Sequence, residues 1–260
     1  MNIVVCVKQT PDTAATVSVE NGVVSWGEAP LVLNPWDEYA VEEALRLKEA
    51  HAGKVTAISL GSEGARDALK QALAMGCDEG VLISDPALGG VDSLIASRAL
   101  AAAIQKLDGI DLALFGRQAV DSDTGLTGAQ VARRLGWPSL SLVSAITELD
   151  PAGRSITVQR MLEEGRQIVR SPLPAALSVV KEINEPRYPS FMGIRKASRA
   201  EIPIWAASDL GMAQVGKAAV SWAEVLPPPR LETRCEFIDG ASPQEIAGRL
   251  VDRLVEEKVL

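Results

Sequence analysis

The stretch that decides the fold lies near the middle of the chain, where residues 110–138 read IDLALFGRQAVDSDTGLTGAQVARRLGWP. The apolar run over 110–115 predicts a buried strand, and the pattern that ends at Gly136 predicts a helix. A loop of small and polar residues joins the two. The first amide groups of a helix have no partner within it, and the helix dipole attracts negative charge, so this loop is a candidate anion site.

The residues of the loop suit a phosphate group. Gly125 and Gly128 allow a close backbone approach, and hydroxyl groups add further donors. These hydroxyl groups belong to Ser122, Thr124 and Thr127. The alternative is an ordinary strand-to-helix turn in which Asp123 or Thr124 caps the helix. The loop is neither a Walker A motif nor a G-x-G-x-x-G fingerprint, which excludes those two phosphate-binding motifs.

The composition indicates a packed, acidic protein of 260 residues. Hydrophobic residues make up 47% and charged residues 23%, which favours one large α/β domain with an appendage over disorder. A net charge of −8 argues against nucleic acid or an anionic membrane as the main partner, because both bind clustered Lys and Arg.

Residues that bind metals or form disulfides are few. Cys6, Cys77 and Cys235 are far apart, which fits a reducing compartment and supports neither a disulfide framework nor a metal site. The one histidine, His51, is expected at a solvated helix C-terminus. No apolar run reaches the roughly 18 to 20 residues that span a bilayer, and the N-terminus enters a strand without signal-peptide features. We therefore expect a soluble, cytoplasmic protein.

The first half of the chain alternates between apolar strands and helices. Asn34 is expected to cap the first helix, Pro35 to occupy its first turn and Asp37 to face its dipole. The alternation predicts a parallel sheet with helices on both faces. Ligands of such sheets bind beyond the carboxyl ends of the strands. We therefore expect one crevice formed by the turns after Val7 and Leu60, residues 34–37 and the loop 116–127. The predicted strands are 3–8, 55–60, 80–84 and 110–115, and the predicted helices begin at 34, 65, 94 and after the loop.

The second half departs from this pattern. Residues 157–161 and 167–170 predict a β-hairpin, as do residues 17–26 around Asn21-Gly22, and residues 175–180 predict one more core strand. Proline and glycine predict an irregular loop over 184–197.

The tail 202–260 is expected to form an arm beside a nucleotide-binding domain of residues 1–201. It contains Trp205, Trp222, the run Pro227–Pro229 and an amphipathic helix over 243–258. These groups are hard to bury in a domain that is already complete at Val180. We expect the arm to wrap a partner subunit, with packing on the chain's own core as the alternative.

Four segments together resemble the beta (small) subunit of electron transfer flavoproteins. They are VCVKQ at 5–9 with Pro11-Asp12-Thr13, LNP at 33–35 with EEA at 42–44, residues 116–138, and NEPRY at 184–188. The resemblance implies an adenine-nucleotide hydrolase-like (Rossmann-like) α/β fold and a larger alpha subunit that holds the redox-active FAD. It also implies that the heterodimer carries electrons from partner dehydrogenases to an acceptor oxidoreductase, without catalytic residues in this subunit.

The resemblance further implies a buried, structural AMP in this subunit. Its contacts map onto the crevice segments, where Cys6 and Leu60 would contribute only their backbone. The mapped residues are Cys6, Asn34, Pro35, Trp36, Asp37, Leu60, Gly116, Arg117, Gln118, Ala119, Val120, Asp121, Ser122, Asp123, Thr124, Gly125, Leu126 and Thr127.

Two alternatives concern the nucleotide. Electron-bifurcating members of the family hold a second FAD in place of AMP, and their loop usually reads D-G-D-T-A-Q-V-G-P. Residues 121–124 resemble its start, whereas residues 125–129 depart from it, so we favour AMP. The second alternative is an ATP-dependent enzyme of the same superfamily. Against it, residues 8–11 stand where such enzymes have an S-G-G-x-D-type pyrophosphate loop.

By the same resemblance, residues 184–197 correspond to a recognition loop that docks partner dehydrogenases through an exposed apolar side chain. Phe191 occupies the place of that anchor. The alternative is that Phe191 folds back onto the core. The expected docking residues are Glu185, Arg187, Tyr188, Phe191, Met192 and Ile194.

Overall fold

The computed structural model describes residues 1–212, 214–227, 229 and 235–260. The chain divides into two compact units, Met1–Val225 and Leu226–Leu260. The strands, all in the first unit, are β1 (Asn2–Cys6), β2 (Gln9–Pro11), β3 (Ser18–Glu20), β4 (Val23–Ser25), β5 (Leu31–Leu33), β6 (Lys54–Leu60), β7 (Glu79–Ile83), β8 (Ile110–Gly116), β9 (Ser139–Asp150), β10 (Ser155–Leu162), β11 (Gly165–Pro172), β12 (Ala175–Val179) and β13 (Ile204–Trp205). The helices are α1 (Pro35–His51), α2 (Arg66–Met75), α3 (Ser93–Lys106), α4 (Thr127–Leu135) and α5 (Phe191–Ser198), with α6 (Pro243–Glu256) in the second unit. The short 3-10 turns are η1 (Glu63–Ala65), η2 (Pro86–Leu88), η3 (Lys181–Ile183) and η4 (Ser208–Leu210).

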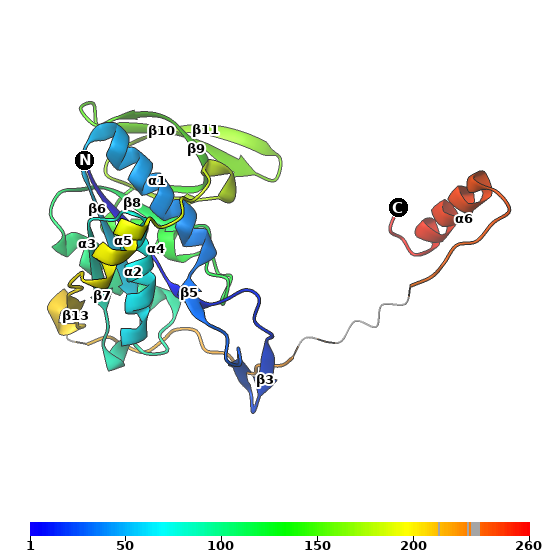
Figure 1. Cartoon of the computed structure of the whole chain (residues 1–260), viewed down its shortest axis with the longest axis horizontal. Helices are drawn as coiled ribbons and strands as arrows, with labels where there is room; N and C mark the ends of the chain where they lie inside the picture. The colour runs from blue at the N-terminus through cyan, green and yellow to red at the C-terminus, as the bar shows by residue number, and fades with distance from the viewer. Residues whose placement is uncertain (213, 228, 230–234) are drawn as a thin grey trace. The chain divides into compact units, whose positions relative to one another are not determined.

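One nine-stranded sheet forms the centre of the first unit (Figure 1). Its order is β11-β10-β9-β12-β8-β1-β6-β7-β13. The seven neighbouring strands β9-β12-β8-β1-β6-β7-β13 are parallel to one another, and the β9-β10 and β10-β11 pairs are antiparallel. The predicted α/β class with a mainly parallel sheet and a β-hairpin is confirmed.

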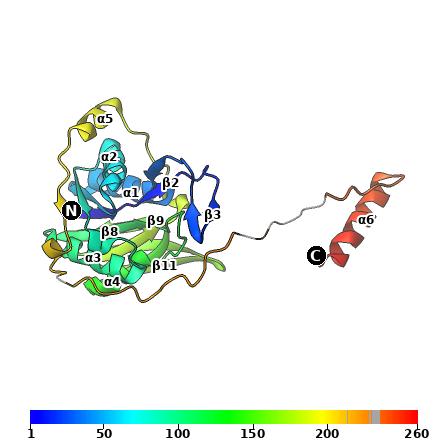
Figure 2. The ribbon, with the colours of Figure 1, turned by 90° about the horizontal axis from the view of Figure 1, so that it is seen from below.

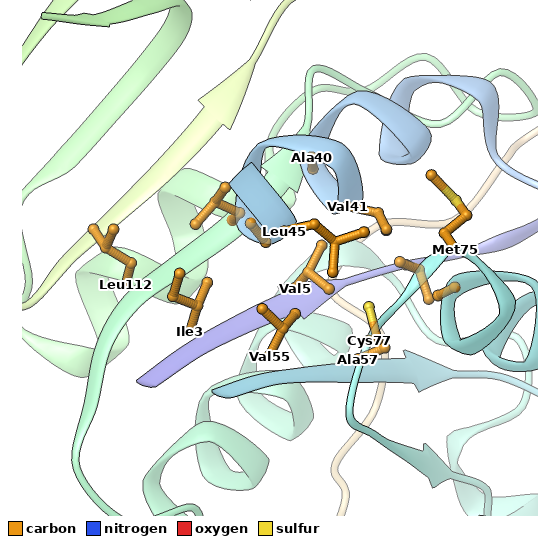
Figure 3. Close-up of a cluster of buried hydrophobic side chains, with 14 of the residues drawn as sticks. Ile3, Val5, Ala40, Val41, Leu45, Val55, Ala57, Met75, Cys77 and Leu112 are labelled. Atoms are coloured by element: carbon orange, nitrogen blue, oxygen red, sulfur yellow. The ribbon is translucent and has the colours of Figure 1, made fainter. Parts of the chain in front are cut away.

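The helices cover both faces of the sheet, because the central strands are apolar on both sides. Helices α1 and α2 lie on one face, and α3 and α4 lie on the other (Figure 2). On the first face Val5, Val41 and Leu45 pack together in a buried cluster (Figure 3). On the second face Val4 and Ile58 pack with apolar residues of α3 and α4.

Local signals account for several boundaries. The turn at Asn21-Gly22 joins β3 and β4 as predicted, with both residues at positive φ. Pro35 begins α1 and His51 ends it, also as predicted. The strand β9 was not predicted; its register with β10 is interrupted twice, which blurs the alternation of side chains.

The prediction of an irregular loop over 184–197 is wrong in its second half, where α5 forms. The hydroxyl group of Ser190 accepts a hydrogen bond from the Gly193 amide at 2.9 Å and so caps this helix. The helix packs on α2. A Cβ atom at Gly193 would overlap the carbonyl group of Ala74, so glycine allows this approach.

Residues 202–225 belong to the first unit, whereas the expected domain boundary stood at 202. Ile202 is buried, and β13 extends the sheet beside β7. Trp205 is half-buried in β13, and the Lys106 ammonium lies 4.6 Å from its ring centroid. Part of the predicted tail therefore belongs to the domain itself, because β13 pairs with the edge strand β7. In the tri-proline run, Pro228 lies outside the described residues.

The second unit contains α6. Ser242 caps this helix through a 3.3 Å bond from the Glu245 amide. The structure describes every residue of α6, and none of them is buried. The predicted apolar stripe of this helix consists of Ile246, Leu250, Leu254 and Val255. Among all helices of the described ranges, none is long and apolar enough to cross a membrane.

Gly193→Ala tests the contact between α5 and α2. In an exposed helix alanine would gain up to about 1 kcal/mol over glycine. Here the overlap with the Ala74 carbonyl should outweigh that gain and lower the free energy of unfolding by about 1–3 kcal/mol. Amide hydrogen exchange over 191–198 should also accelerate.

Gly248→Ala in α6 is the matched control, because no described atom lies within 4 Å of a Cβ atom at that position. This variant should be neutral or stabilising. Unchanged exchange over 191–198 in Gly193→Ala would contradict the close contact.

Candidate functional site

The carboxyl ends of β1, β6, β7 and β8 border one cavity of about 1610 Å³. All four segments that the sequence predicted to converge contribute to its wall: the turns after Val7 and Leu60, residues 34–37 and the loop 116–127. The predicted crevice at the carboxyl edge of a parallel sheet is therefore present in the structure.

Asp37 joins three elements at the base of this cavity. Its carboxylate accepts hydrogen bonds from the Lys8 amide at 2.8 Å and the Gly116 amide at 3.2 Å. Asp37 lies in the first turn of α1, as predicted, and its side chain is buried. The backbone amides at the ends of β1 and β8 also bind this carboxylate, which the sequence did not predict. Gly116 is tightly packed there, since a Cβ atom would overlap Asp37 and the backbone of Trp36.

Asn34 holds the start of the loop 116–127. Its side-chain amide donates to the Gln118 carbonyl at 2.9 Å, and its side-chain oxygen accepts from the Val120 amide at 3.2 Å. Its backbone amide donates to the Lys8 carbonyl at 2.9 Å. Among the described residues no side chain caps α1, so the predicted capping role of Asn34 is wrong. Asn34 instead ties the loop to the helix.

The loop then turns into α4. The residue before this helix is Leu126, and no side chain of the described residues caps it. The alternative of a cap by Asp123 or Thr124 is therefore wrong. The first amide groups of α4 are left without an intrahelical partner, as an anion site requires. The described wall of the cavity includes Ser122, Thr124, Gly125, Leu126, Thr127 and Gly128.

The charges around the cavity are mixed. The Lys8 ammonium pairs with Asp121 at 2.7 Å, and Arg117 lies with its guanidinium carbon 5.6 Å from the Trp36 ring centroid. Burial raises the pKa of Asp37 to about 7, although hydrogen bonds from Lys8 and Gly116 lower it.

Cys6 lines the cavity, where its thiol is held in the protonated form. Burial, and secondarily the charge of Asp37, raise the pKa of its thiol well above the ordinary value. In the parts of the chain that the structure describes, no group of His, Cys, Asp and Glu side chains is placed to hold a metal ion.

The cavity brings together most, but not all, of the residues that the sequence assigned to nucleotide binding. Five assigned residues lie outside its wall: Pro35, Trp36, Val120, Asp121 and Asp123. Residues that the sequence analysis missed include Lys8, Ser84, Asp85, Asp92 and the segment 218–225. The carboxyl end of the predicted strand 80–84 was an available signal for Ser84 and Asp85, whereas nothing local marked the segment 218–225.

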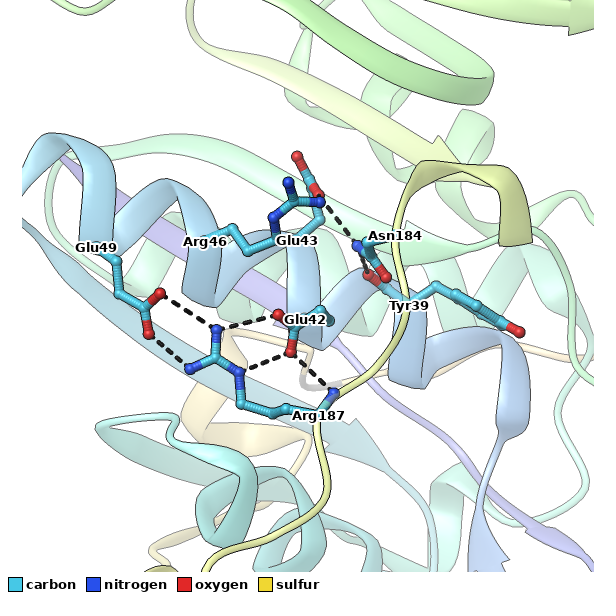
Figure 4. Close-up of polar contacts among 7 residues, drawn as sticks. All are labelled: Tyr39, Glu42, Glu43, Arg46, Glu49, Asn184 and Arg187. Atoms are coloured by element: carbon cyan, nitrogen blue, oxygen red, sulfur yellow. Dashed lines mark hydrogen bonds and ion pairs between the residues drawn. The ribbon is translucent and has the colours of Figure 1, made fainter.

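The segment 184–198, called the docking segment below, is anchored on α1 by ion pairs (Figure 4). The Arg187 guanidinium donates to Glu42 at 2.7 and 3.0 Å and to Glu49 at 2.6 and 3.2 Å. The backbone amide of Arg187 also donates to Glu42 at 3.1 Å. Glu42 is buried, so Arg187 compensates a charge that would otherwise be costly. Asn184 adds bonds to the Tyr39 carbonyl and the Glu43 carboxylate.

Beyond this anchor the docking segment exposes large side chains. Tyr188 is 95% exposed and Phe191 79%, so Phe191 does not fold back onto the core. Met192 and Ile194 are exposed as well, as is Glu185, while Arg187 is half-buried. A rigidly held segment with several exposed apolar groups has the character of a protein-binding surface.

The comparisons with known proteins agree with this architecture. Residues 22–210 match the family described as "Electron transfer flavoprotein domain". The chain is 37% identical to the caffeyl-CoA reductase-Etf complex subunit CarD of Acetobacterium woodii, over 100% of both chains. It is 38% identical to the electron transfer flavoprotein subunit beta of Clostridium acetobutylicum, over 99% of both chains. It is also 38% identical to Protein FixA of Azorhizobium caulinodans, over 85% of this chain and 80% of that protein.

The resemblance found in the four sequence motifs is thus confirmed over the whole length of the chain. Beta subunits of this kind carry electrons and are not catalytic enzymes. The chain belongs to the electron transfer flavoprotein family, as a beta-type subunit.

Proposed function

We propose that this chain binds AMP in the cavity at the carboxyl edge of the sheet and pairs with an alpha subunit that holds FAD. The heterodimer carries electrons from partner dehydrogenases to an acceptor oxidoreductase. One observation carries the AMP site: the uncapped N-terminus of α4 borders a cavity, and Asn34 and Asp37 fix the start of the loop that lines it.

The phosphate of AMP suits the α4 end of the cavity. Free amide groups and the hydroxyl groups of Ser122, Thr124 and Thr127 supply donors there. The adjacent Gly125 has a φ of +61°, which brings the backbone close to the ligand without a side chain. Bound AMP would supply structural stability and no redox chemistry.

The second candidate is a second FAD in the same cavity. Ligand pockets commonly measure about 300–1,000 Å³, and this cavity of about 1610 Å³ is larger. Its wall also includes residues of the segments 84–93 and 218–225. The extra volume favours a dinucleotide, whereas Thr127-Gly128 favours AMP.

Docking of partner dehydrogenases is assigned to the docking segment, with Phe191 as the central apolar anchor. The support is its exposure beside Tyr188, Met192 and Ile194, and the firm attachment by Arg187. A preorganised surface loses little entropy on binding.

Contact with the alpha subunit is assigned to the second unit, Leu226–Leu260, which is the part of the predicted arm that lies outside the first unit. The support is the apolar stripe of α6, of which Leu250 is 45% and Val255 56% exposed. An amphipathic helix without a buried face in its own unit is suited to a groove on a partner.

Gly125→Val tests the phosphate site. A β-branched residue at positive φ strains the loop, so the variant heterodimer should retain less nucleotide and melt at a lower temperature. The measurement is the amount of nucleotide extracted per heterodimer, with chromatography to distinguish AMP from FAD.

Gly136→Val is the matched control. Gly136 has a φ of +71° at the end of α4 and lies outside the described wall of the cavity, so the variant has similar strain at another place. It should lower the melting temperature and keep its nucleotide. Equal nucleotide content in Gly125→Val and the wild type would contradict the proposed site.

Phe191→Ala tests docking. Because a buried aromatic anchor is worth about 2 kcal/mol or more, electron transfer from the partner dehydrogenase should slow by at least about tenfold. Melting temperature and flavin content should stay at wild-type values, since Phe191 is exposed in the free protein.

Ile168→Ala serves as control, because Ile168 is 59% exposed on β11, away from the docking segment. Its transfer rate should match the wild type. Normal transfer rates in Phe191→Ala would exclude the anchor.

A further inference from the structure

The segment Ala218–Val225, called the strap below, lines the same cavity as the loop 116–127. It follows the sheet edge at β13 in the chain and leads directly into the arm at Leu226. Among its residues, those in the cavity wall are Ala218, Val220, Ser221, Trp222, Ala223, Glu224 and Val225.

Asp92 fastens the strap to the start of α3. One carboxylate oxygen accepts from the Ile95 amide at 3.0 Å and caps the helix. The other oxygen accepts from the Ala219 amide at 2.7 Å and the Val220 amide at 3.2 Å. Capping α3 needs only one oxygen of Asp92, as in most helix caps. The other oxygen binds the strap and fixes its position in the cavity wall.

The strap is held by such polar bonds and little by core packing. Val220 is 66% exposed and Trp222 80%, although both border the cavity. The preceding chain differs, because Ala207, Leu210 and Met212 are buried in the core, in addition to bonds from the Ala207 amide to Asp85 and from Arg98 to the Val215 carbonyl. A segment fastened like the strap opens at low cost.

The chemistry of the strap suits the ring of a nucleotide rather than its phosphate. The strap contains no Lys or Arg and has one acidic residue, Glu224. The donors for phosphate lie at the α4 end of the cavity. Trp222 presents a large aromatic surface that no packing in this unit buries, and such surfaces stack on planar rings.

We infer that the strap is part of the nucleotide site: Trp222 covers the adenine ring of the bound nucleotide, and Asp92 is the positioning residue that holds the strap over it. The inference rests on the proposed adenine-nucleotide site.

The test measures the release rate of radiolabelled AMP from the intact heterodimer into excess unlabelled AMP, with FAD as a parallel probe. Trp222→Ala should release the nucleotide at least about tenfold faster, whereas Trp222→Phe, which retains an aromatic ring, should remain near the wild type. Asp92→Ser should also accelerate release, because serine caps α3 with its one oxygen but cannot hold the strap as well.

In the nucleotide-free protein, Asp92→Ser should keep the wild-type melting temperature, because serine retains the cap of α3. This comparison separates the positioning role of Asp92 from its role as a helix cap. Wild-type release rates in both Trp222→Ala and Asp92→Ser would overturn the inference. Loss of the heterodimer in Trp222→Ala would also overturn it and assign Trp222 to the contact with the alpha subunit. If the wild-type heterodimer binds neither AMP nor FAD in this cavity, the proposed function itself fails, and the inference fails with it.

Discussion

The buried carboxylate of Asp37 is the interaction on which the site depends. It accepts one amide from the end of β1 and one from the end of β8, and it belongs to the first turn of α1. Three separate elements are thereby fixed at one point of the sheet edge. Asn34 extends the arrangement to Gln118 and Val120. The start of the loop 116–127 is thereby fixed to α1, and no side chain of the described residues caps α4.

Helix α1 relates the two functional regions of the subunit. Its first turn forms part of the cavity wall, and its later turns carry Glu42 and Glu49, which hold Arg187 of the docking segment. The pKa of Glu49 is lowered by its hydrogen bond with Arg187, in keeping with a formed ion pair. A single helix thus borders the cavity and holds the exposed docking segment. Under the proposed function, AMP bound in the cavity would stabilise the helix that presents this segment.

The sequence predicted the fold class, the hairpins and the four crevice segments, because these follow from periodicity and from the common edge of parallel strands. The hydrogen bonds of Asn34 and Asp37 could not be predicted from their neighbours in the sequence. Their partners lie 84 and 79 residues away, at Gln118 and Gly116, and these tertiary contacts displaced the expected local cap. Likewise Gly193 suggested a loop, yet its missing side chain is what lets α5 approach α2. The sequence analysis placed the segment 218–225 in the arm, since only the tertiary structure brings this segment to Asp92 and the cavity.

The dissociation constant of AMP for a heterodimer with Asp37→Asn, at a pH above the raised pKa of Asp37, tests the central claim most directly. Asparagine keeps the shape but replaces one acceptor with a donor, so a buried amide of Lys8 or Gly116 loses its partner at a cost of about 1–3 kcal/mol. Glu38→Gln is the control, because Glu38 bonds Gln71 outside the described wall of the cavity. The account predicts a dissociation constant raised at least about tenfold for Asp37→Asn and unchanged for Glu38→Gln. Wild-type affinity in a folded Asp37→Asn heterodimer would contradict it.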